Sequence, residues 1–83
     1  METMIVEISV PAISKTYDFQ LPAGGLVRDV IAEITRILVE TQHGIRFDDY
    51  YPMLCHLNDG RVLNPEDTLA AAGVYDGVSL MLI

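Results

Sequence analysis

Apolar and polar residues alternate along two stretches near the start of the chain. In residues 4–10, one face carries only apolar side chains, and the opposite face carries Glu7 and Ser9 together with Ile5. In residues 17–21, aromatic and aliphatic side chains again alternate with polar ones. A period of two is typical of a half-buried strand, so each stretch is predicted to be a strand. The short break at Pro11 favours an antiparallel hairpin.

The pattern changes to a helical period after a loop at residues 22–25. Apolar side chains then recur at steps of three and four residues within residues 26–42: Val27, Val30, Ile31, Ile34, Ile37 and Leu38. Such a stripe predicts an amphipathic helix that turns its apolar face to the core. On the opposite face, Arg36 is in reach of Glu33 and Glu40, which favours ion pairs along the helix.

A third strand is predicted at residues 53–57, and its facing has two solutions. Either Met53, Cys55 and Leu57 point toward the core, or Leu54 and His56 do. The first set is the more apolar, and this favours the first solution.

Turn signals divide the remainder of the chain. Asp59-Gly60 precedes a short fourth strand at residues 62–63. Residues 64–73 open with Asn-Pro-Glu-Asp, which is typical of the start of a short helix, and Leu69 is expected to pack inward. After a turn at Asp76-Gly77, residues 79–83 form the closing strand. This strand is apolar on both faces, which predicts a central place in the sheet.

The order of these elements predicts an α+β fold of the β-grasp, ubiquitin-like type. It reads ββαββ(short α)β, a mixed sheet packed on one main helix. The 83 residues leave room for one core, so residues 1–83 are predicted to form a single domain.

Charge and composition narrow the classes of function. Five basic and twelve acidic residues give a formal net charge of -7, and the basic residues are dispersed. Nucleic acid binding is therefore not expected. No apolar run approaches the about 18 residues that span a bilayer, and no signal peptide is recognisable, so no membrane insertion and a cytoplasmic location are expected.

Few residues have the chemistry of a catalytic or metal site. Cys55 and His56 are neighbours in a strand, so their side chains point to opposite faces and cannot pair. Both, with His43, are interpreted as structural. Asp48-Asp49 is interpreted as surface charge in a loop. No catalytic, cofactor-binding or metal-binding residue is predicted, and the chain is not expected to be an enzyme or to need a cofactor.

The acidic, aromatic loop before the third strand contains the candidate partner contacts, which are Tyr50, Tyr51 and Met53. Tyrosine is enriched at the centre of interfaces because it combines a large rigid ring with a hydrogen-bonding tip. The alternative interpretation places one tyrosine in the core and the other on the surface.

Several of these segments resemble known families. Residues 57–63, Leu-Asn-Asp-Gly-Arg-Val-Leu, together with the closing Leu-x-Leu strand, resemble the second half of ubiquitin. Residues 17–22 leading into the Ile/Val-rich helix resemble the YukD/EsaB family of small ubiquitin-like proteins. Thr68-Leu69, residues 72–74 and Asp76-Gly77 with the closing strand also fit this family. They equally resemble the ubiquitin-like N-terminal domain of the EccD membrane protein. The similarity extends over essentially the whole chain.

The resemblance implies a non-catalytic accessory or regulatory component of a type VII (WXG100, or ESX-like) secretion system. Its partners would be other components, such as the FtsK-like ATPase or an EccD-like membrane protein, and a homodimer is left open. One alternative is a ubiquitin-like sulfur carrier or protein modifier. That chemistry needs a terminal Gly-Gly, whereas the di-glycine here, Gly24-Gly25, precedes the main helix. The other alternative is a ubiquitin-like domain excised from an EccD-like membrane protein.

Overall fold

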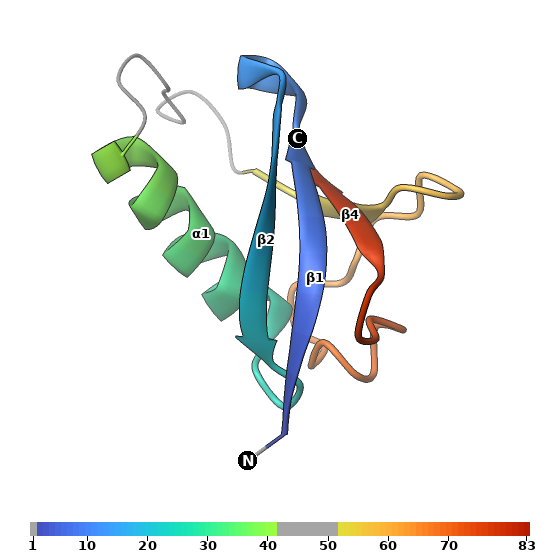
Figure 1. The fold of residues 1–83 in the computed structure, drawn as a ribbon. Coiled ribbons are helices and arrows are strands. Elements are labelled where there is room, and N and C mark those ends of the chain that lie inside the picture. Colours follow the sequence, from blue (N-terminus) through green and yellow to red (C-terminus); the bar gives the residue numbers. More distant parts are fainter. Residues whose placement is uncertain (1, 42–51) are drawn as a thin grey trace.

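A computed structural model of the chain describes residues 2–41 and 52–83. The described elements are strand β1 (Thr3–Val10), strand β2 (Lys15–Pro22), helix α1 (Val27–Thr41), strand β3 (Leu54–His56) and strand β4 (Ser79–Leu82). A 3-10 turn, η1 (Pro11–Ile13), joins the first two strands. The strands form a mixed sheet in the order β2-β1-β4-β3, and α1 lies on one side of it (Figure 1). This is the predicted arrangement of a mixed sheet on one main helix.

β1 and β2 form the predicted antiparallel hairpin. Their register runs from Thr3 opposite Pro22 to Val10 opposite Lys15. Pro11 begins the connecting turn, where a missing N–H costs nothing. The chain then reverses at Ser14, whose φ is 53°.

β4 occupies the predicted central place in the sheet. It runs parallel to β1, with Leu80 beside Ile8, and antiparallel to β3, with Leu80 opposite His56. The next residue continues the ladder, because the backbones of Ile83 and Met53 exchange two hydrogen bonds of 2.9 and 2.8 Å. The closing segment is therefore paired with a strand on each side.

The inner face of the sheet and one face of α1 share an apolar core. The described helix residues that are buried follow the predicted stripe: Val27, Val30, Ile34 and Leu38. The inner face of β1 is buried along its length: Met4, Val6, Ile8 and Val10. Full burial of one such aliphatic side chain contributes about 1.5–3 kcal/mol, so this contact is what holds the helix on the sheet.

The ion pairs predicted on the solvent face of α1 are confirmed. Arg36 lies 2.5 Å from a carboxylate oxygen of Glu33 and 3.1 Å from one of Glu40. The hydrogen bond from Arg36 lowers the pKa of Glu33, and the same contact raises the pKa of Arg36. Because all three side chains are exposed, these pairs add little to stability.

The favoured facing of β3 is wrong. Leu54 and His56 point to the core, whereas Met53 and Leu57 are 44% and 46% exposed. The cause is the register with β4, because Leu54 pairs with Leu82 and His56 with Leu80, and directly opposed residues share a face of the sheet. Cys55 is buried as expected, but it lies on the outer face.

His56 is accommodated at the edge of the core by one polar contact. Its Nε2 atom lies 3.1 Å from the carbonyl oxygen of Ala72, and a neutral imidazole can donate a hydrogen bond there. A buried polar ring is tolerated when such a partner is present.

The predicted short helix at residues 64–73 is not formed, and the segment is a series of turns. Its carbonyl groups are used elsewhere, because Pro65 and Asp67 accept hydrogen bonds from the backbone N–H groups of Arg28 and Val27. These N–H groups start α1 and have no partner within their own helix. Leu69 is buried, as predicted.

The predicted fourth strand at residues 62–63 is also not a strand. It is reduced to a single bridge between Val62 and Cys55. Leu63 still contributes to the core, and its N–H donates to the carbonyl oxygen of Leu54.

Candidate functional site

The outer face of the sheet, which is turned away from α1, has an apolar half over β3 and β4. The other half, over β1 and β2, is called acidic here after Glu7 and Asp18, and it also carries the exposed Ile5. The strand register sets its rows, because Cys55 pairs with Met81 and Met81 with Ser9. In the next row, Ser79 pairs with Glu7, and Glu7 with Asp18. Both rows continue across β1 to β2, so the two halves of the face adjoin along the sheet.

The apolar half is a contiguous group that we call the outer patch. Its members are Met53, Leu57, Val62, Met81 and Ile83. All except Met81, which is half-buried, are between 42% and 49% exposed. Singly exposed apolar residues are ordinary on protein surfaces, but a contiguous group is typical of a binding surface.

Backbone pairing brings these side chains together. Met53 and Leu57 flank β3, two residues before and after Cys55, and the backbone pairing with β4 continues through both, so all three lie on one face. Met53 is opposite Ile83, and the N–H of Leu57 donates to the carbonyl oxygen of Ser79 at 3.1 Å. Val62 joins through its bridge to Cys55, which lies beneath the group and is 2% exposed. The outer patch is therefore built on the sheet itself.

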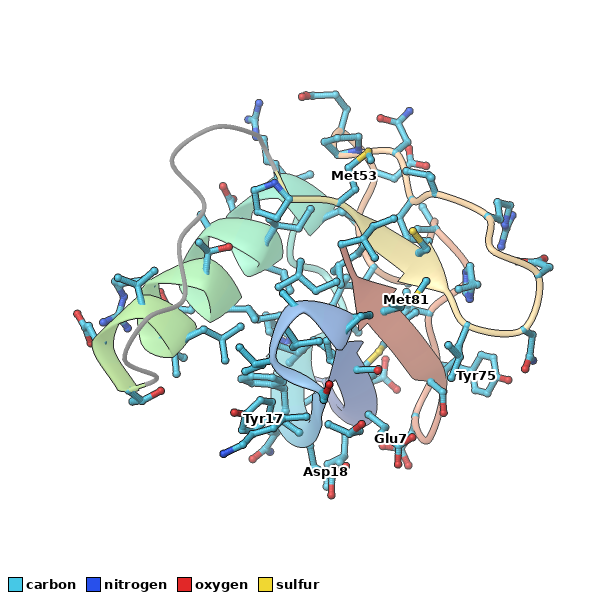
Figure 2. The ribbon with its side chains drawn as sticks, turned by 90° about the horizontal axis from the view of Figure 1, so that it is seen from above. Glu7, Tyr17, Asp18, Met53, Tyr75 and Met81 are labelled. Carbon is cyan, nitrogen blue, oxygen red and sulfur yellow. The ribbon has the colours of Figure 1, made fainter. Side chains whose placement is uncertain are left out.

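The acidic half lies beside the outer patch. Glu7 and Asp18 are directly opposite each other on β1 and β2, and both are exposed. Figure 2 shows Glu7 and Asp18 on the side of the strands that is turned away from α1. The Ser79 hydroxyl donates to a carboxylate oxygen of Glu7 at 3.4 Å, which ties Glu7 to β4.

The four basic residues of the described part lie away from this face. Arg28 and Arg36 belong to α1 and pair with Glu66 and with neighbouring helix residues. Lys15 is opposite Val10, whose side chain points to the core side of the sheet. The Arg61 guanidinium lies close to Gly73. The carboxylates of the outer face thus have no cationic neighbour among the described residues.

Of the three candidate contacts from the sequence, Met53 lies on the outer patch. Tyr50 and Tyr51 lie outside the described residues. The other members of the patch were missed as contacts. The alternation of residues 79–83 already separates Met81 and Ile83 from the buried Leu80. Leu57 could not be identified in this way, because the facing predicted for β3 is wrong.

The remaining candidate groups do not converge. Cys55 and His56 point to opposite faces of β3, as predicted, and burial raises the pKa of the Cys55 thiol. In residues 2–41 and 52–83, no three His, Cys, Asp or Glu side chains are placed to hold a metal ion. Gly24-Gly25 lies in the turn before α1, as predicted. Within the same described ranges, no helix is long and apolar enough to cross a membrane.

Comparison with solved structures identifies the fold. The EccD5 ubiquitin-like domain from Mycobacterium xenopi is 24% identical, with a TM-score of 0.82 over 100% of this chain and 94% of that chain. The ubiquitin-like domain of EccD1, a type VII secretion system protein of Mycobacterium tuberculosis, is 25% identical, with a TM-score of 0.68 over 100% and 99% of the two chains. The predicted ubiquitin-like β-grasp fold is confirmed.

A larger assembly contains a similar domain. A chain of an ESX-5 inner membrane complex is 19% identical, with a TM-score of 0.81 over 100% of this chain and 21% of that chain. No match was found among curated proteins.

The family follows from a match over nearly the whole chain. The model of the family described as "WXG100 protein secretion system (Wss), protein YukD" matches residues 5–82. The chain therefore belongs to the YukD family and is a ubiquitin-like module associated with type VII secretion.

Proposed function

We propose that this chain is a non-catalytic, cytoplasmic binding module that docks onto a larger protein of a type VII secretion system through its outer patch. The FtsK-like ATPase and the EccD-like membrane component are the partners that the family suggests. The observation that carries the proposal is the contiguous exposure of Met53, Leu57, Val62 and Ile83 on the outer face of the sheet.

The chemistry of the outer patch supports contact with a protein. Methionine is enriched in interfaces because its flexible, polarisable side chain adapts to different partners, and the patch contains Met53 and Met81. The surface is also held by backbone pairs, so binding would require little ordering of this side.

The surroundings of His56 and Cys55 support a non-catalytic role. The His56 ring contacts the Ala72 carbonyl oxygen, and the Cys55 thiol is buried with a raised pKa. A thiol of raised pKa is a poor nucleophile because little thiolate is present at neutral pH.

The proposal is tested by binding of the purified chain to the cytoplasmic parts of the type VII ATPase and of the EccD-like component from the same genome. We expect Met53→Ser combined with Leu57→Ser to weaken binding about tenfold or more, because buried apolar contacts at the centre of an interface carry most of its energy. Biolayer interferometry gives the affinity, and circular dichroism checks that the variant is folded.

Val39→Ser is the matched control. Val39 is 51% exposed, comparable to Met53 and Leu57, but it lies on α1 on the other side of the molecule. Its substitution is expected to leave binding unchanged. Equal losses from the two variants, or binding by neither secretion component, would contradict the proposal.

The same variants can show whether a second copy of the chain covers the outer patch. If light scattering shows that the chain forms a dimer, and the Met53→Ser/Leu57→Ser variant dissociates it while Val39→Ser does not, then the outer patch is covered by a second copy. That outcome would refute docking to the secretion machinery through this surface.

A further inference from the structure

The acidic half of the outer face places two like charges together. Glu7 and Asp18 are directly opposed on neighbouring strands, a position where carboxylates repel each other. Both side chains are exposed, and no basic side chain of the described residues lies on this face. A cationic group from another molecule would relieve this repulsion.

The two carboxylates lie next to the outer patch on the same face of the sheet. Leu57, directly after β3, is followed across the sheet by Ser79 on β4, Glu7 on β1 and Asp18 on β2. With strands about 4.8 Å apart, Glu7 lies about 10 Å and Asp18 about 15 Å from the line of Leu57. The Ser79 hydroxyl holds Glu7 on the side nearer the patch.

We infer that the partner segment is apolar where it covers the outer patch and basic where it crosses β1 and β2, with Lys or Arg side chains facing Glu7 and Asp18. This inference rests on the proposed function of the patch and specifies the chemistry of what binds there. The net charge of -7 adds to the attraction, because a field of one sign draws a cationic segment toward this surface.

Synthetic peptides test the inference without a known partner. A helical peptide of about 16 residues is about 24 Å long, enough to cross the four strands. The probe peptide carries leucines on one face of its first half and arginines on the same face of its second half. A second peptide has glutamate in place of each arginine, and a third has glutamine in place of each leucine.

We expect the leucine/arginine peptide to shift the backbone amide signals of Glu7, Asp18 and Met81 in the isotope-labelled chain. The other two peptides should bind at least about tenfold more weakly, because one lacks the positive charges and the other lacks the apolar side chains. Raising the salt concentration should weaken the leucine/arginine complex, since exposed charges are screened.

Two double variants remove the same amount of negative charge from the chain. They distinguish binding at Glu7 and Asp18 from attraction by the net charge of the whole chain. Glu7→Gln/Asp18→Asn removes the outer carboxylates, and Glu40→Gln/Glu66→Gln removes two exposed carboxylates that pair with arginines of α1. We expect the first variant to lower the affinity of the leucine/arginine peptide about tenfold and the second to change it little. Equal losses, equal binding of the glutamate peptide, or no binding of any peptide would overturn the inference.

The inference and the proposed function can fail separately. If binding to the secretion component depends on Met53 and Leu57 but not on Glu7 and Asp18, the docking surface stands and the basic character of the partner is refuted. If neither pair matters, both proposals are refuted.

Discussion

At the scale of single residues, Gly73 makes one of the turns in the segment between β3 and β4. Gly73 has a φ of 83°, in the left-handed region that side chains with a Cβ atom disfavour. It follows Ala72, whose carbonyl oxygen contacts the His56 ring. The turn at Gly73 therefore supports the contact that accommodates the one buried polar side chain among the described residues.

Gly73→Ala is expected to lower the free energy of unfolding by about 1–2 kcal/mol, the cost of left-handed backbone for a residue with a Cβ atom. The added Cβ would lie 3.2 Å from the end of the flexible Arg61 side chain, which can move, so the backbone is the main cost. Urea denaturation followed by circular dichroism measures the change.

Gly24→Ala is the control for this substitution. Gly24 does not have a positive φ, and apart from its chain neighbours no residue has an atom within 4 Å of an added Cβ. The same change should be neutral or stabilise the chain by up to about 1 kcal/mol, because alanine restricts the unfolded state. Equal destabilisation at both positions would contradict the role assigned to Gly73.

At the scale of elements, α1 forms the helix that its sequence predicts, whereas residues 64–73 do not. α1 forms where predicted because its apolar stripe is long enough to be buried along several turns. The later segment has the composition of a helix start, yet its carbonyl groups bind the first N–H groups of α1. A short helix is marginal by itself, so such tertiary hydrogen bonds can replace it.

The packing of α1 predicts a sharp contrast between two of its residues. Ile34 is fully buried and Val39 is 51% exposed on the same helix. We expect Ile34→Ala to lower the free energy of unfolding by about 2–5 kcal/mol, because it leaves a cavity under the sheet. Val39→Ala should change it by no more than about 0.5 kcal/mol. Chemical denaturation of both variants checks this, and similar values would show that α1 does not pack as described.

At the scale of the whole molecule, β4 connects distant parts of the chain. It pairs with β1, near the start of the sequence, and with β3, which lies between α1 and β4 in the sequence. A strand bonded on both sides opens only when the sheet as a whole opens. β4 is therefore the element on which cooperative folding of the described sheet depends.

Amide hydrogen exchange tests this cooperative role. The amides of Leu80 and Met81 are expected to exchange with the free energy of global unfolding, because both residues are paired within β4. Amides at the free edge of β2 should exchange faster. Rapid exchange throughout β4 under native conditions would contradict the sheet order and the place of residues 79–83.

The pattern of amino acids is enough to predict the hairpin, the main helix, the turns and the central place of the closing strand, and it carries the resemblance to the YukD family. These features depend on local periodicity and on turn residues such as Gly60 and Gly77, whose φ values are positive. Burial on one face leaves a periodic signature in such segments, so their pattern can be read without knowing which neighbour covers them.

Tertiary contacts set the facing of β3, replace the short helix and bring together the residues of the outer patch. A strand of three residues has too few side chains to reveal its inner face, so its register with β4 settles the matter. The outer patch joins β3, β4 and Val62, whose proximity depends on strand pairing. Residues far apart in sequence become one surface only when the backbone ladder aligns them, and that alignment is a property of the folded sheet.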